Sequence, residues 1–309
     1  MKPILETIDT RFGTASKHAF SRGNTLPYTG VPFGMNYFVP QTSDQEGSWF
    51  FNPQLPIFQG VRLTHQPSPW IGDYSWLLLT PVTGESSGDT LFHRQSSYNL
   101  DRAIFNPHYL RIFSERYQIE TQLTPTCYGT SIQLRQIQGK KLSLYLHAAD
   151  DLSLEQVDER TVSLGQSGLT ETNKSPLVMF TALAFSKDIL SINQVGQDWR
   201  IDLAGAEALV QLATSFISKK QALFNLPRKD FEETKSEAKA SWEDLLGRFD
   251  VVETGSVDRT FFDHCLYRLF LFPQTFYEVN EQGETIHIDL ASGTIKPGLL
   301  FTNNGFWDT

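Results

Sequence analysis

The sequence predicts a mainly β fold, an antiparallel β-sandwich followed by two α-helices. Between about residues 107 and 218, apolar residues alternate with polar ones or run together over strand lengths. Short turn sequences such as Gln138-Gly139 separate these segments, and no helical period intervenes. From about residue 227 the apolar spacing becomes that of a helix. A large β region is therefore expected to precede a smaller helical region.

The composition agrees with a globular chain of more than one unit. The chain has 309 residues, 40% of them hydrophobic and 20% charged, which is too long for most single cores. The net charge is −9 and the Lys and Arg residues are scattered, so nucleic acid is not an expected partner. No signal peptide and no apolar run of membrane-spanning length is visible, which predicts a cytoplasmic protein.

The first hundred residues are rich in Gly, Pro and aromatic residues, as at 27–34 and 49–53. This content excludes long helices and indicates short strands joined by shaped loops. Clearer strand patterns follow at 109–112, 143–147, 177–185 and 208–217.

Two helices are predicted after the strands. The first begins near Pro227 and ends near Gly247, and its apolar face consists of Phe231, Ala238, Trp242, Leu245, Leu246 and Phe249. The second spans roughly 257–272 and is apolar around more than half of its circumference, which indicates burial on both sides. Residues 286–290 and 299–302 then resemble a hairpin-like extension.

The last residues and the cysteines give two further expectations. Asp308 and Thr309 are both good N-cap types, which suggests a helical domain beyond residue 309. Cys127 and Cys265 lie far apart in different predicted elements, so buried free thiols are expected instead of a disulfide.

The loop His65-Gln66-Pro67-Ser68-Pro69-Trp70-Ile71-Gly72-Asp73-Tyr74 is the main candidate binding element. An indole can stack on a sugar while an imidazole and a carboxylate bind its hydroxyl groups, so His65, Trp70 and Asp73 are candidate substrate-binding residues. The alternative is structural: the aromatic rings cover a sheet edge, His65 is a satisfied interior residue, and Asp73 caps a turn. Signatures of nucleophilic triads, zincins and nucleotide sites are lacking in the sequence.

Six sequence blocks, in this order, resemble bacterial α-mannosidases of glycoside hydrolase family 92. They are IDTRFGT (8–14), PFGM with VP (32–40), QGVRLTH (59–65), GD with LTPV (72–82), CLYRLFLFP (265–273) and WDT (307–309). WEDLL at 242–246 also fits the family's linker helix. Each block is short, but their common order makes the resemblance specific, and it spans almost the whole chain.

The resemblance implies a β-sandwich at 1–222, a helical linker at 223–275 and the start of an (α/α)6 catalytic barrel at 276–309. It also implies inverting, calcium-dependent hydrolysis of mannose-containing glycans, of the α-1,2 type, in a cleft between the two domains. By the same resemblance, the loop His65 to Asp73 faces that cleft, and Trp307 and Asp308 lie at the mannose subsite.

The chain departs from the family at 15–24, where the family is often rich in Gly and His, and at 65–68, where it often has His-Leu-Ser-Gly. By the resemblance, both segments lie where the family recognises its substrate. The linkage specificity is therefore not predicted.

Inverting hydrolysis needs an acid and a base whose carboxyl groups lie roughly 6.5–9.5 Å apart. Asp73, Asp101, Glu120 and Asp308 are the candidates in this chain, but the sequence pairs none of them. We expect the acid, the base and the calcium ligands outside this chain, which has no EF-hand-like loop. The chain alone is accordingly expected to be inactive and to bind neither calcium nor mannose strongly.

Two other functions stay open at this stage. The chain is either a stand-alone carbohydrate-binding or interaction module without catalysis, or a hydrolase with its own site among the sandwich loops. Apolar linker helices that a sandwich alone does not cover also predict contact with the chain's own catalytic domain or a homodimer.

Overall fold

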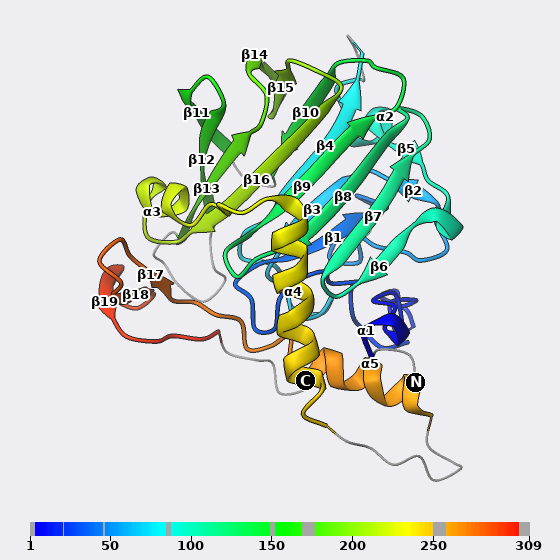
Figure 1. The fold of residues 1–309 in the computed structure, drawn as a ribbon, viewed down its shortest axis with the longest axis vertical. Helices are drawn as coiled ribbons and strands as arrows, with labels where there is room; N and C mark the ends of the chain where they lie inside the picture. The colour runs from blue at the N-terminus through cyan, green and yellow to red at the C-terminus, as the bar shows by residue number, and fades with distance from the viewer. Residues whose placement is uncertain are drawn as a thin grey trace.

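The computed structural model describes residues 4–20, 22–45, 47–84, 88–148, 152–168, 177–249 and 258–302. It confirms the predicted sandwich, since two antiparallel sheets pack face to face (Figure 1).

The smaller of the two packed sheets has six strands in the order β1-β3-β4-β10-β15-β14. Each pair of neighbours is antiparallel. In chain order the strands are β1 (Tyr37–Gln41), β3 (Gly60–Thr64), β4 (Leu77–Thr83), β10 (Leu142–His147), β14 (Ile189–Val195) and β15 (Asp198–Leu203).

The larger sheet has eight strands in the order β11-β12-β13-β16-β9-β8-β7-β6 and is also antiparallel. Its strands are β6 (Ile104–Asn106), β7 (Tyr109–Ser114), β8 (Ile119–Pro125), β9 (Gly129–Gln136), β11 (Leu152–Asp158), β12 (Thr161–Gly168), β13 (Leu177–Phe185) and β16 (Glu207–Ser215). The strand patterns read from the sequence at 109–112, 143–147 and 177–185 are thus confirmed.

The core lies between the two sheets because alternate residues of each strand point inward. The smaller sheet contributes Val61, Leu79 and Leu144, and the larger contributes Leu134 and Val210. These side chains line the same narrow space. Their neighbours along each strand therefore point to the two outer faces, one of which carries the candidate site.

The first hundred residues contain only short helices within the described ranges, as their Gly and Pro content predicts. The small elements are α1 (Ile4–Thr7), α2 (Leu91–Arg94), the 3-10 helix η1 (Leu100–Arg102), and β2 (Ile57–Phe58) paired with β5 (Ser96–Ser97).

Within the described residues, three helices follow the sandwich: α3 (Lys219–Phe224), α4 (Phe231–Leu246) and α5 (Arg259–Leu269). Of these, α4 and α5 were predicted and α3 was not. α3 contacts β13 and β16, and α4 contacts β8 and β9, so both cover the outer face of the eight-stranded sheet (Figure 1). No helix in the described ranges is both long and apolar enough to cross a membrane.

Helix α4 is fixed at its start and along one face. Asp230 caps it by accepting a hydrogen bond from the amide of Glu233. Its buried residues recur every three or four positions, at Phe231, Thr234, Ala238, Trp242 and Leu246. The Trp242 indole donates to the Gly30 carbonyl over 2.7 Å. This contact ties the helix to the loop before β1.

Helix α5 has one anchored face and one open face, as expected of linker helices whose apolar faces the sandwich alone does not cover. Tyr267 and Arg268 donate hydrogen bonds to carbonyl groups near the N-terminus, including that of Thr10 for Arg268. Phe261 and Leu269 are exposed. The helix is therefore held by polar contacts on one side, while apolar side chains on its other side are exposed to solvent.

Two predictions are corrected by the structure. The C-terminal sheet consists of β17 (Glu278–Val279), β18 (Thr285–Asp289) and β19 (Thr294–Pro297), so the second strand of the hairpin precedes the expected 299–302. Both cysteines are free, as predicted, but neither is fully buried, since Cys127 is partly exposed and Cys265 lies exposed on the open side of α5. Val257, Trp307, Asp308 and Thr309 lie outside the described residues.

Candidate functional site

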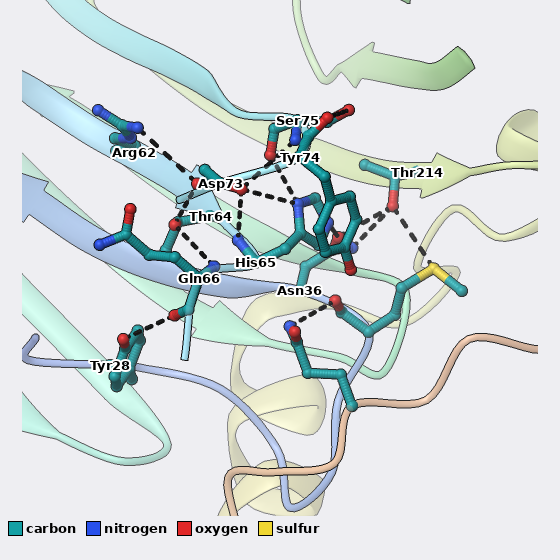
Figure 2. Close-up of polar contacts among 12 residues, drawn as sticks. Tyr28, Asn36, Arg62, Thr64, His65, Gln66, Asp73, Tyr74, Ser75 and Thr214 are labelled. Carbon is teal, nitrogen blue, oxygen red and sulfur yellow. Dashed lines mark hydrogen bonds and ion pairs between the residues drawn. The ribbon is translucent and has the colours of Figure 1, made fainter. Parts of the chain in front are cut away.

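The predicted binding loop joins two buried strands, since β3 ends at Thr64 and β4 begins at Leu77. Pro67 and Pro69 restrict its backbone. Figure 2 shows that its polar side chains turn inward and bind one another. The loop is therefore held by its own hydrogen bonds as well as by the strands.

His65 belongs to the interior of this loop. It is 1% exposed, and its Nδ1 and Nε2 atoms hydrogen-bond the Ser75 carbonyl at 2.6 Å and the Asn36 side-chain oxygen at 2.8 Å (Figure 2). Its ring stacks on Tyr74 with centroids 4.6 Å apart. Direct sugar binding by this imidazole is therefore not what the structure supports, and the structural alternative describes His65 better.

Asp73 ties the two ends of the loop together. Its carboxylate accepts hydrogen bonds from the Thr64 hydroxyl and the His65 amide (Figure 2). It also lies 3.8 Å from the Arg62 guanidinium. The side chain is only 4% exposed, yet it lines a cavity described below. Asp73 thus holds the loop from within and contributes a carboxylate to the cavity wall.

Trp70 points to solvent, with 50% of its surface exposed. Its ring meets Trp49 edge-on at 4.9 Å and His18 at 5.2 Å. These three rings, from three separate segments, are called the aromatic cluster. Flat rings that remain exposed can stack on the C–H face of a sugar. Of the three loop residues predicted to bind substrate, Trp70 is the one whose exposure suits that role.

A cavity of about 770 Å³ lies on the outer face of the six-stranded sheet, beside this loop. We call it the sheet pocket. Strands β1, β3, β10 and β15 form its floor, while the segment after β1 and helix α2 form its walls. Its charged or titratable lining residues are Asp44, Arg62, Asp73, Asp89, Arg94, His147 and Asp198.

Arg62 lies at the floor of the sheet pocket between two aromatic rings. Its guanidinium is 4.0 Å from the Phe50 ring and 3.9 Å from the Trp76 ring. Burial lowers the pKa of Arg62 to about 10, although Asp73 acts in the opposite direction. The group therefore remains charged at neutral pH, held by a carboxylate and by two π faces.

A second ionic group lines the sheet pocket from helix α2 and strands β10 and β15. Arg94, which is 1% exposed, pairs with Asp198 and lies over the Tyr145 ring at 4.3 Å. The other oxygen of Asp198 is 2.6 Å from Nδ1 of His147. Burial raises the pKa of Asp198, but His147 and Arg94 outweigh that effect and leave it below its ordinary value.

Arg62, Arg94, His147 and Asp198 were not among the site residues predicted from the sequence. Arg62 offered a signal, because a charged residue sits in the otherwise apolar strand sequence Gly60 to Leu63. Arg94, His147 and Asp198 offered none, since they come from segments far apart in the chain. The sheet order brings His147 and Asp198 together, and helix α2 brings Arg94 against Asp198.

Of the four carboxylates considered as acid or base, Asp308 lies outside the described residues and the other three lie on separate elements. Asp101 is exposed on η1, whereas Glu120 lies on β8 of the other sheet and accepts a hydrogen bond from Gln122. Asp73 is bound within its loop. In the part of the chain that the structure covers, no three His, Cys, Asp or Glu side chains gather as a metal site. We therefore assign neither an acid–base pair nor calcium ligands here.

Comparisons with known proteins point to one family. The sequence model of the glycosyl hydrolase family 92 N-terminal domain matches residues 7–221, and that of the family 92 catalytic domain matches residues 219–309. The comparison with curated proteins finds no match.

Several solved structures are similar. The family 92 inverting mannosidase BT2199 of Bacteroides thetaiotaomicron VPI-5482 shares 25% identity and a TM-score of 0.89 over 99% of this chain. The α-mannosidase BT3965 of Bacteroides thetaiotaomicron has 18% identity and a TM-score of 0.79 over 98%. The family 92 hydrolase ccman5 has 15% identity and a TM-score of 0.81 over 98%.

This chain spans less than half of each of those proteins, 44% of BT2199 and 45% of the other two. The N-terminal family model alone covers more than half of the present sequence. The sandwich, the helices after it and the order of the sequence blocks agree with these matches. The chain therefore belongs to glycosyl hydrolase family 92.

Proposed function

We propose that this chain is the N-terminal portion of an exo-acting α-mannosidase that removes α-1,2-linked mannose from glycans with inversion and with the help of calcium. The observation that carries the proposal is the match to both family 92 domain models together with the likeness to BT2199, which is described as an inverting mannosidase. The departures at residues 15–24 and 65–68 make the linkage the least constrained part of the proposal.

The proposed division of the chain follows the sequence prediction. Residues 1–222 form the sandwich, 223–275 the linker, and 276–309 the beginning of the catalytic domain. Trp307 and Asp308, proposed to lie at the mannose subsite, belong to that last part. A cytoplasmic location and a homodimer through the linker helices remain predictions from the sequence.

The chain's own contribution, in this proposal, is recognition of the substrate. The aromatic cluster presents Trp70 to solvent, while the buried bonds of His65 and Asp73 fix the loop that carries it. A fixed ring loses little conformational freedom when a sugar stacks on it. Calcium would supply charge at the sugar hydroxyls and is bound, in this proposal, by residues outside the described part of the chain.

Hydrolysis of α-1,2-mannobiose by the whole protein tests the proposal. Inversion predicts that β-mannose appears first, before mutarotation, which proton NMR of the anomeric signals resolves. Removal of calcium with a chelator should abolish turnover, and added calcium should restore it. The 309-residue chain assayed alone should release no mannose. First release of α-mannose, or turnover unaffected by the chelator, would contradict the mechanism.

Trp70→Ala in the whole protein tests the role of the loop. Loss of one stacking contact should lower kcat/KM about tenfold, if stacking contributes about 1–2 kcal/mol. Phe92→Ala is the matched control, because Phe92 is an exposed aromatic residue that does not line the sheet pocket. Equal kinetics for Trp70→Ala and the control would return the loop to a structural role.

A further inference from the structure

The sheet pocket has a chemistry that recognition by Trp70 does not use. Its floor and walls carry two arginines and four aspartates, with His147 between them. Because negative charge exceeds positive charge, a phosphate or another polyanion would be repelled. No metal-binding cluster occurs among the described side chains, which argues against a cation. A neutral polar ligand fits this balance of charge.

Stability alone does not explain why these charges are buried. Arg94 and Asp198 are almost fully buried on the outer side of a sheet, where apolar side chains of similar size would do as well or better. The ion pair with Asp198 also does not satisfy all the hydrogen-bond donors of the Arg94 guanidinium. Within the described residues, no partner is found for Nε and Nη1 of Arg94 or for Nε of Arg62. Buried donors without partners commonly mark places where water or a ligand completes the bonds.

The pocket offers both kinds of hydrogen-bonding group that sugar hydroxyls need. Asp44 and Asp89 are exposed carboxylates at its rim. The imidazole of His147 is partly exposed, and its Nδ1 is fixed by Asp198. Trp76 adds an aromatic surface, with its ring 5.5 Å from that of His147. A hydroxyl group both donates and accepts, so it can bridge carboxylates and cationic donors.

We propose that the sheet pocket is a carbohydrate-binding site that holds a neutral pyranose unit through the Arg94–Asp198–His147 group and Trp76. Its volume of about 770 Å³ lies within the usual range for small-ligand sites. The proposal concerns binding and includes no chemical step. It goes beyond the proposed function, since it stands on the pocket's own residues and does not require the chain to be part of a mannosidase.

Titration of the full 309-residue chain with methyl α-mannoside, followed by NMR of the tryptophan indole N–H groups, tests this site. The Trp76 signal, identified with Trp76→Phe, should shift on titration and give a dissociation constant, whereas the Trp199 signal should stay in place. Parallel titrations with methyl β-galactoside and inorganic phosphate separate sugar selectivity from anion binding. Saturable binding of phosphate in place of sugar would overturn the proposal.

Two variants locate the binding. Arg94→Met and His147→Phe should each weaken mannoside binding about tenfold. Each substitution removes either a hydrogen bond to the ligand or a residue that positions the groups of the Arg94–Asp198–His147 group. His147→Phe decides the question if Arg94→Met fails to fold. The matched controls are Arg160→Met, in an exposed ion pair with Asp188, and His287→Phe, which is partly buried on β18 and does not line the sheet pocket. Both controls should bind like the unchanged chain.

Trp70→Ala separates this inference from the proposed function. Binding that persists in Trp70→Ala and is lost in His147→Phe supports the sheet pocket, even if the whole protein hydrolyses no mannoside. Binding that is lost in Trp70→Ala and unchanged in His147→Phe overturns the inference and leaves the mannosidase proposal intact. Absence of any saturable shift with either sugar also overturns it.

Discussion

The outer faces of the two sheets of the sandwich differ in what lies on them. The eight-stranded sheet is covered by helices α3 and α4 (Figure 1). The Phe231 ring meets the Tyr109 ring of β7, and the Nζ atom of Lys235 lies 4.2 Å from the centre of the Tyr109 ring. The six-stranded sheet instead carries the sheet pocket, with buried arginines paired to aspartates.

This difference separates residues that serve the fold from residues that serve recognition. A helix on a sheet removes apolar surface from water, which stabilises the folded chain. A buried ion pair costs desolvation and adds little net stability. We therefore expect the covered face to govern stability and the open face to govern binding.

The largest effect is expected for Trp242→Ala on the covered side. Trp242 is fully buried, packs on Tyr267 at 5.3 Å and donates to the Gly30 carbonyl. Its truncation leaves a cavity and an unmet carbonyl, and should cost about 3–5 kcal/mol of unfolding free energy. Urea unfolding measures this. Glu243→Ala, next to it on the exposed side of α4, should change stability by less than about 0.5 kcal/mol.

Arg94→Met removes a deeply buried charge from the open face, which is the outer face of the six-stranded sheet. The substitution leaves Asp198 with His147 but without its arginine, at a cost of about 3 kcal/mol. Arg160→Met removes an exposed pair and should cost less than about 1 kcal/mol. Unfolding curves at neutral pH compare the two variants. Equal costs would mean that the Arg94–Asp198 pair behaves as a surface pair.

The covered face should also make stability depend on pH through His108. Burial, with added repulsion from Lys239 and Lys235, lowers the pKa of His108 from 6.5 to about 4. The unfolded chain takes up this proton first, so the stabilisation is complete above pH 6.5 and is lost as pH falls towards 4.

The loss between these pH values is on the order of 3 kcal/mol. Unfolding free energies of the unchanged chain and of His108→Gln, measured at several pH values in this window, should differ by a pH-dependent amount. His287→Gln, at a partly exposed position on β18, serves as the control. Identical pH slopes for the unchanged chain and His108→Gln would show that His108 is not the group responsible.

The smallest effect on stability is expected for Trp70→Ala. Half of this side chain is exposed, and its contacts are edge contacts within the aromatic cluster. Its removal should change the unfolding free energy by less than about 1 kcal/mol. A much larger loss, measured by urea unfolding, would make Trp70 part of the fold and remove the reason for assigning it to recognition.

The predictions from the sequence pattern were correct for elements whose own residues show a clear periodicity. The strand at 177–185 and the helix around Trp242 were recognised because their apolar residues recur with the period of the element. The second strand of the C-terminal hairpin was placed at 299–302 because those residues are apolar. The turn at Gly293 instead pairs Ile288 with Ile295, which leaves Leu299 exposed.

The candidate site was predicted only in part. Proline and tryptophan in the 65–74 segment indicated a shaped loop, and the structure gives that loop an exposed Trp70. The sequence could not tell which of its polar residues face inward. His65 is buried because Ser75, near the other end of the same loop, and Asn36, from a separate segment of the chain, hydrogen-bond its two ring nitrogens.

By itself, the sequence determined the succession of sandwich and helices, and its ordered blocks pointed to family 92. Those features depend on periodicity and on residue order, which are local. Tertiary structure alone decided the sheet pocket. Arg62, His147 and Asp198 meet because β3, β10 and β15 belong to one sheet while lying far apart in the chain, and helix α2 brings Arg94 against Asp198. Strand pairing over such separations depends on the packing of the whole core, which no local pattern specifies.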